Sequence, residues 1–129
     1  LELSGMVGTT FTGSQISLGR LVGENGLVIV ARESGCPISE KLGPRLKSLE
    51  QKFSKSGFPF VYLYVGAIDP LRNAVRDQDK YNFNGPYLID PNFDLAKKLE
   101  LKKTTEVVVF SSKSKLLYRG AVDDQFEVG

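Results

Sequence analysis

The stretch Leu27–Ser39, LVIVARESGCPIS, sets the interpretation of the whole chain. Its first five residues are a continuous apolar run of strand length, which is typical of a strand covered on both faces of a sheet. A polar segment follows and holds the only cysteine, Cys36, directly before Pro37. Proline is favoured at the first position of a helix, because its missing N–H would have no partner there. The stretch therefore predicts a buried strand, a short connection and a helix start, with a thiol at the junction.

The residues after the cysteine have the spacing of a helix with one apolar face. That face is formed by residues three or four positions apart, namely Ile38, Leu42, Leu46, Leu49 and Phe53. Pro44 lacks a backbone N–H and clashes with the preceding turn, so we expect the helix to kink about two turns after it begins. Gly57 is expected to end it.

Strands and helices alternate through the middle of the chain. A second apolar run, Phe58–Val65, predicts another buried strand. A helix is predicted from Asp69 to Tyr81, with one face formed by Leu71, Ala74, Val75 and Gln78. A short strand at Pro86–Asp90 then precedes a helix that carries Phe93, Leu95, Ala96 and Leu99.

Both ends of the chain predict antiparallel hairpins. About residues 1–22 are polar and glycine-rich, which predicts a small N-terminal β-hairpin or arm. Two apolar runs, Glu106–Phe110 and Leu116–Val122, are joined by a short polar turn and predict a C-terminal β-hairpin. The whole order predicts an α/β fold: a central mixed sheet of parallel core strands with a C-terminal β-hairpin, flanked by helices. With no repeat or linker, we expect one domain over residues 1–129.

Composition limits the kinds of function. The 17 basic and 15 acidic residues give a net charge of +2 and are spread along the chain, which argues against nucleic acid as a partner. The sequence has no run of about 18 apolar residues, so we expect no insertion of this segment into a membrane. One cysteine forbids an internal disulfide, and the lack of histidine removes the usual ligands for zinc, copper or haem. A carboxylate site for Mg²⁺ or Ca²⁺ stays open, but no calcium-loop spacing occurs, so we expect no metal and no cofactor.

The order of elements, with a cysteine after the first core strand, resembles the thioredoxin fold. Within that fold it resembles the redoxin branch, the alkyl-hydroperoxide-reductase/thiol-specific-antioxidant and cytochrome-maturation type. The resemblance covers about residues 10–124 and rests on the cysteine before the first long helix and on Pro44 eight residues later. It also rests on an inserted helix and strand ending in Leu88-Ile89-Asp90-Pro91, and on the return strand Leu117–Gly120. The resemblance implies that Cys36 is the attacking cysteine.

Two positions depart from the family pattern. The family's dithiol motif is Cys-x-x-Cys, whereas this chain has Cys36-Pro37-Ile38-Ser39. The family also has a cis-proline before the third core strand, where this chain has Thr105 followed by Glu106. A cis bond is costly without proline, so a trans Thr105 would alter the groove that grips the substrate.

Cys36 is the candidate nucleophile because its position favours the thiolate. As the N-cap of a helix that begins at Pro37, its sulfur would lie over the free N–H groups of Ile38 and Ser39, and cysteines so placed are acidified. The Ser39 hydroxyl can turn toward the same sulfur. Gly35 would let a substrate approach closely.

Other nearby residues act on the same sulfur. Thr105 and Glu106 are expected to flank it, although ordinary polarity at a strand start explains them too. Arg32 and Lys41 would support the thiolate, while Glu33 and Glu40 would oppose it. A solitary cysteine can instead be a small buried hydrophobe, and the two roles weigh about equally here.

A single thiol limits the chemistry. Ser39 is no nucleophile toward sulfur at neutral pH, so an external thiol, either glutathione or a protein dithiol, must complete any exchange. Three reactions remain: exchange with mixed disulfides, disulfide isomerisation, and peroxide reduction through a sulfenic acid. The peroxiredoxin motif Pro-x-x-x-Thr/Ser-x-x-Cys is not matched, because Ile29 and Glu33 occupy its first two fixed positions.

The leading hypothesis is a monothiol, redoxin-like thiol oxidoreductase or antioxidant whose partners are an external thiol and a disulfide or peroxide substrate. The alternative is a non-catalytic thioredoxin-fold module that binds a peptide or partner protein, which the missing second cysteine and missing cis-proline favour. Copper or haem handling is disfavoured by the lack of histidine and of paired cysteines. Because Leu1 is not a natural start, we expect an excised or mature domain, and both the bacterial cytoplasm and the periplasm stay open as its compartment.

Overall fold

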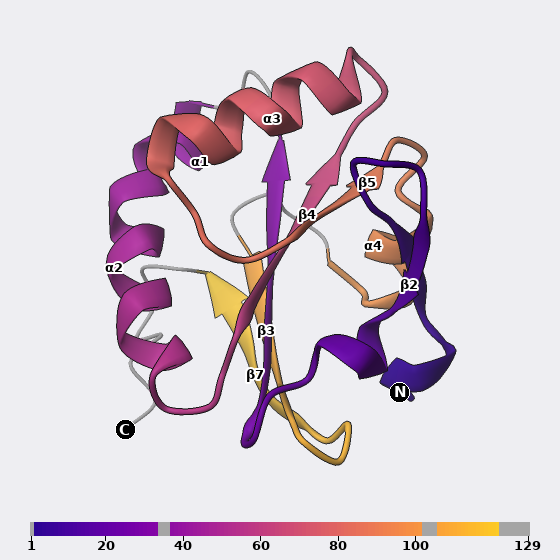
Figure 1. The fold of residues 1–129 in the computed structure, drawn as a ribbon, viewed down its shortest axis with the longest axis vertical. Helices are drawn as coiled ribbons and strands as arrows, with labels where there is room; N and C mark the ends of the chain where they lie inside the picture. The colour runs from indigo at the N-terminus through magenta and orange to yellow at the C-terminus, as the bar shows by residue number, and fades with distance from the viewer. Residues whose placement is uncertain (1, 34–36, 102–105, 122–129) are drawn as a thin grey trace.

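The computed structural model describes residues 2–33, 37–101 and 106–121. Within them, seven strands form one sheet in the order β2-β1-β5-β4-β3-β6-β7 (Figure 1). The strands are β1 (Val7–Thr9), β2 (Gln15–Ser17), β3 (Gly26–Glu33), β4 (Phe60–Val65), β5 (Tyr87–Asp90), β6 (Glu106–Ser111) and β7 (Leu116–Ala121). The helices are α1 (Pro37–Lys41), α2 (Gly43–Ser54), α3 (Pro70–Tyr81) and α4 (Asp94–Lys98), with short 3₁₀ turns η1 (Leu3–Gly5) and η2 (Leu18–Leu21).

The centre of the sheet is parallel and its margins are antiparallel. Strand β3 pairs in parallel with β4, and β4 pairs in parallel with β5. Strand β6 is antiparallel to both β3 and β7, and β1 is antiparallel to β2 and β5. The predicted mixed sheet with a parallel core and a C-terminal hairpin is thus confirmed.

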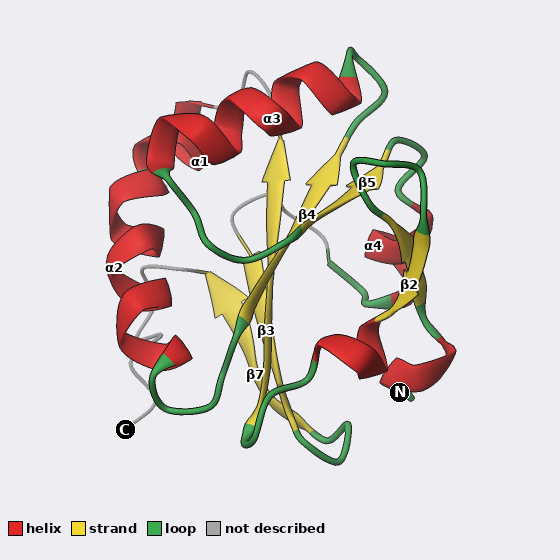
Figure 2. Cartoon of the chain, viewed as in Figure 1, coloured by secondary structure: helices red, strands yellow, loops and turns green. Residues whose placement is uncertain are grey.

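The sheet is covered on both faces, with helices on each side of the strands (Figure 2). Alternate side chains of β3 enter different cores. Leu27 and Ile29 pack into the core that includes α4 and the 3₁₀ turns, whereas Val28 and Val30 pack with α2 and α3. All four are buried, and full burial of such a side chain stabilises the fold by about 1.5–3 kcal/mol. The continuous apolar run therefore reflects two-sided burial, as predicted.

The predicted kink after the cysteine segment is present as a break between two helices. Helix α1 ends at Lys41 and α2 begins at Gly43, with Pro44 in its first turn. Gly43 is needed there because a Cβ atom would lie 2.2 Å from the ring of Tyr81. Leu46 and Leu49 of α2 are buried, which confirms part of the predicted apolar face.

The predicted inner face of α3 is wrong in part. Ala74 is buried and Gln78 is half-buried, but Leu71 and Val75 are 48% and 38% exposed. The helix is rotated so that Asp77, three residues after Ala74, faces the interior, where it binds a buried arginine described below. The inner face of α3 is therefore set by the need of the buried arginine for a carboxylate partner, and not by the spacing of Leu71 and Val75.

Two buried carboxylates fix the connections around β5. Asp90 ends β5 and accepts hydrogen bonds from the backbone N–H groups of Leu95 (3.1 Å) and Ala96 (2.9 Å), which lie in the first turn of α4. Glu50 of α2 accepts one from the Tyr62 hydroxyl at 2.9 Å and others from the backbone of the loop before β5.

None of the helices in the described part of the chain is long and apolar enough to cross a membrane.

Candidate active site

The predicted site residues that the structure describes lie at one end of the sheet. Pro37 and Ile38 are the first two residues of α1, which follows the carboxyl end of β3. Glu106 begins β6, next to that same end of β3, because its neighbour Val107 pairs with Val30. Gly35, Cys36 and Thr105 lie outside the described residues.

Ser39 is the predicted site residue with the most unusual environment. It lies in α1 and is only 1% exposed. Its hydroxyl oxygen is buried and has no hydrogen-bond partner among the described residues. A hydroxyl left unpaired in the interior is unfavourable by about 1–3 kcal/mol. The buried Oγ therefore has an unused hydrogen-bonding capacity close in sequence to Cys36.

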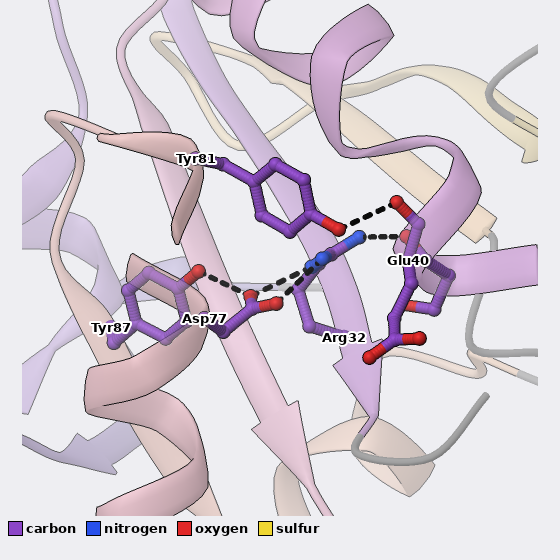
Figure 3. Close-up of polar contacts among 6 residues, drawn as sticks. Arg32, Glu40, Asp77, Tyr81 and Tyr87 are labelled. Atoms are coloured by element: carbon purple, nitrogen blue, oxygen red, sulfur yellow. Dashed lines mark hydrogen bonds and ion pairs between the residues drawn. The ribbon is translucent and has the colours of Figure 1, made fainter. Parts of the chain in front are cut away.

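A buried arginine anchors the same segment. Arg32, near the end of β3, is 1% exposed, and its guanidinium forms a two-pronged ion pair with Asp77 of α3. Nε lies 2.9 Å from Oδ2 and Nη2 lies 2.6 Å from Oδ1. The remaining arm, Nη1, donates a hydrogen bond to the backbone carbonyl of Ser39 (Figure 3). Arg32 thus links β3, α1 and α3.

Aromatic side chains surround this ion pair. The Arg32 guanidinium carbon lies 5.3 Å from the ring centre of Tyr81 and 5.7 Å from that of Phe83, within the range of cation–π attraction. The Tyr81 hydroxyl donates a hydrogen bond to the Glu40 carbonyl at 2.7 Å, and the Tyr87 hydroxyl donates one to Asp77 (Figure 3). Two successive carbonyls of α1 are therefore held, one by Arg32 and the next by Tyr81.

Burial and neighbouring charges fix the protonation states of Arg32 and Tyr87. Burial disfavours the charged form of Arg32, but the hydrogen bonds and negative charge of Asp77 outweigh it and raise the pKa of the guanidinium. Burial raises the pKa of the Tyr87 hydroxyl well above its ordinary value, and the charge of Asp77 raises it further. The guanidinium stays charged and the phenol stays neutral across the physiological range.

Arg32 has a different role from the one expected. The sequence led us to expect that it would support a thiolate through its charge, but its guanidinium is bound to Asp77 and Ser39. Asp77, Tyr81 and Tyr87 were missed altogether. The one available signal was Arg32 itself, a charged residue directly after an apolar strand run. An arginine buried at such a position requires a carboxylate partner, so the sequence could have indicated that one exists.

A cavity of about 240 Å³ adjoins the network between α1 and α3. Its charged lining consists of the acids Glu33, Glu40 and Asp77 and the bases Arg76 and Lys80. Tyr64 and Asn73 complete it. Among the residues that the structure describes, no group of three or more side chains is arranged to hold a metal ion.

Comparison with known proteins identifies the fold. No protein-family model and no curated protein matches the sequence. An uncharacterized conserved protein from Geobacillus kaustophilus superposes with a TM-score of 0.86 at 21% identity, over 100% of this chain and 71% of that chain. A secreted Mycobacterium tuberculosis disulfide oxidoreductase, homologous to Escherichia coli DsbE, gives 0.72 at 17% identity, over 86% and 79%. The peroxidoxin BcpB of the same organism gives 0.72 at 16% identity, over 95% and 87%.

The likeness extends over nearly the whole chain. The thioredoxin domain of a thiol-disulfide oxidoreductase from Bacteroides vulgatus superposes with a TM-score of 0.73 at 14% identity, over 92% of this chain and 85% of that chain. The mixed sheet, its helices on both faces and these superpositions together show that the chain has a thioredoxin-like fold.

Proposed function

We propose that the chain is a redoxin-type thiol oxidoreductase in which Cys36 is the nucleophile and a thiol from outside the chain completes the reaction. The main support is the start of α1 at Pro37, just after the carboxyl end of β3 in a thioredoxin-fold sheet. Cys36 directly precedes Pro37, and its position corresponds to that of the attacking cysteine of that fold.

The first turn of α1 offers groups that would stabilise a thiolate. The N–H groups of Ile38 and Ser39 lie where a helix leaves its amides without an intrahelical partner. The unpaired Ser39 hydroxyl adds a third donor, for which a thiolate is a suitable acceptor. Because α1 has only five residues, local hydrogen bonds rather than a long helix dipole would carry the effect. Arg32 and Tyr81 would hold these donors in place through the carbonyls of α1.

The other proposed roles concern the substrate. Gly35 would let the substrate come close to the sulfur, and Thr105 with Glu106 would line the groove in which it lies. Glu106 begins a strand beside β3, at the sheet end where α1 starts, which supports its place in this set.

The proposed reaction proceeds by two exchanges. The Cys36 thiolate attacks one sulfur of a disulfide, so that a mixed disulfide forms and the other sulfur leaves as a thiolate. An external thiolate then attacks the substrate sulfur of the mixed disulfide. This step releases the Cys36 thiolate and leaves a new disulfide between the external thiol and the substrate sulfur. With a peroxide, the Cys36 thiolate takes one oxygen to become a sulfenic acid and an alkoxide leaves. One external thiol then displaces water from it, and a second releases Cys36.

The test is turnover of a small disulfide and of a peroxide with glutathione as the external thiol. Wild type should turn over at least one of them and accumulate a glutathione adduct at Cys36, detectable by mass spectrometry. Cys36→Ser should abolish both turnover and adduct. Ser39→Ala should lower the rate by roughly ten-fold, since it removes one hydrogen bond to a charged sulfur. Turnover that persists undiminished in Cys36→Ser would contradict the proposal.

One observation favours a second candidate, a non-catalytic module that binds a peptide or partner protein. Ser39 stands where a second thiol would resolve the mixed disulfide, and it is sealed from solvent at 1% exposure. In that case the fold would be kept as a binding scaffold and Cys36 would be a packing residue. Absence of both turnover and the glutathione adduct in folded wild type would favour this candidate.

A further inference from the structure

The cavity between α1 and α3 has its charges segregated between its walls. The acids Glu33 and Glu40 come from the end of β3 and from α1, whereas the bases Arg76 and Lys80 both come from α3. Asp77, which also lines the cavity, is neutralised by Arg32 and hydrogen-bonded by Tyr87. The cavity therefore presents one negative and one positive wall.

These wall charges are available to a ligand. Within the described part of the chain, the side chains of Glu33, Glu40 and Arg76 form no ion pair and no hydrogen bond. The Lys80 ammonium lies 5.3 Å from the ring centre of Tyr81 and likewise forms no ion pair among these residues. A pure anion would be attracted by the basic wall but repelled by the acidic wall, and a pure cation would experience the reverse. A group that carries both signs is attracted by each.

The size of the cavity narrows the class of ligand. Pockets for drug-sized molecules have volumes of about 300–1,000 Å³. A cavity of about 240 Å³ is smaller, and suits a group the size of an amino acid rather than a length of folded protein. Its position is equally telling, because Glu33 and Glu40 lie three residues before and four residues after Cys36. A chain of three residues spans at most about 11 Å, which is the upper limit for the separation of the Glu33 and Cys36 Cα atoms.

We infer that this cavity binds the external thiol, and that this thiol is a small molecule of the amino-acid type, with an ammonium group and a carboxylate beside its sulfur-bearing part. The inference rests on the proposed function, because it names the class of thiol that the second exchange requires. The ammonium would face Glu33 and Glu40, and the carboxylate would face Arg76 and Lys80.

The test uses S-methylglutathione, whose blocked sulfur cannot exchange with Cys36. It is titrated into the whole chain carrying Cys36→Ser, and backbone amide shifts are followed by nuclear magnetic resonance. Shifts should gather at Glu33, Glu40 and the Asn73–Lys80 part of α3. N-acetyl-S-methylglutathione, which lacks the ammonium, should bind about two- to five-fold more weakly, as expected for loss of one partly exposed charge contact.

A matched pair of variants isolates the positive wall. Arg76 and Arg72 are both exposed arginines of α3, one helical turn apart, but only Arg76 lines the cavity. Arg76→Gln should weaken binding about two- to five-fold, and Arg72→Gln should leave it unchanged. Equal effects of the two substitutions, or shifts that do not gather at the cavity, would overturn the inference.

The outcomes separate this inference from the proposed function. If S-methylglutathione binds in the cavity but wild type shows no turnover, the thiol chemistry fails and the site stands. If turnover occurs equally fast with glutathione and with uncharged 2-mercaptoethanol at matched thiolate concentration, and no cavity shifts appear, the chemistry stands and the site fails.

Discussion

Replacing Arg32 with methionine tests the network that holds α1. Methionine keeps much of the length of the side chain but removes the charge and all five donors. The Asp77 carboxylate, 11% exposed, would be left with the Tyr87 hydroxyl as its partner, and the Ser39 carbonyl would lose its donor. Removing one partner of a buried ion pair destabilises a protein by about 3–5 kcal/mol. Since domains of this kind unfold at a cost of about 5–15 kcal/mol, we expect Arg32→Met to remain folded but to lose about 4 kcal/mol.

The assay is urea unfolding followed by far-ultraviolet circular dichroism, with two comparison variants. Arg32→Lys keeps the charge but not the fork that contacts Asp77 twice, so it should lose about 1–3 kcal/mol. Arg32→Met combined with Asp77→Asn removes the orphaned charge and should be more stable than the sum of the two single losses predicts. A loss below about 1 kcal/mol in Arg32→Met, or strict additivity in the double variant, would refute the account of Arg32 as the buried anchor of α1.

Three further predictions follow from other contacts. Asp90→Ala should lower the free energy of unfolding by about 2 kcal/mol in urea titrations, because it leaves the Leu95 and Ala96 amides unpaired. As a control, Asp94→Ala at an exposed position of α4 should change that free energy by less than half as much. Burial, with the charges of Glu50 and Asp77, raises the pKa of the Tyr62 and Tyr87 hydroxyls, so the folded state keeps protons that the unfolded chain releases above the ordinary tyrosine pKa of 10.0. Their contribution to stability is full below that pH and should fall above it, by about 1.4 kcal/mol per pH unit for each tyrosine, and Tyr62→Phe should make the fall shallower. Ser39→Cys should form a disulfide with Cys36 on mild oxidation, seen as the loss of two hydrogen atoms by mass spectrometry, whereas protection of both thiols from oxidation would contradict the proposed closeness of residues 36 and 39.

Much of the fold could be predicted because local signals and burial agree. The run Leu27–Ala31 is apolar at every position, and the structure buries it between two cores. Pro44 cannot continue a helix ladder, and a helix does break just before it. Leu88-Ile89-Asp90-Pro91 suggested the redoxin insertion, and the Asp90 carboxylate is what fixes the start of α4.

The network of Arg32 could not be predicted from spacing. Its partner Asp77 lies 45 residues away in the sequence, so nothing local links the two. For the same reason the inner face of α3 was misassigned: Leu71 and Val75 have the right spacing, but the need of Arg32 for a carboxylate turned Asp77 inward. Ser39 was predicted as a site residue because it follows Cys36 by three residues in the sequence. That its hydroxyl is buried without a hydrogen-bond partner depends on the packing of α1 and could not be predicted.

The ionisation of Cys36 is the most direct test of the account. The ultraviolet absorbance of wild type, less that of Cys36→Ser, gives the thiolate fraction as the pH is raised. A sulfur served by two helix amides and a buried serine hydroxyl should titrate below the free value of about 8.5, and Ser39→Ala should move its pKa upward. A Cys36 pKa at or above that value would show an ordinary buried thiol, and the proposed redox chemistry would have no nucleophile.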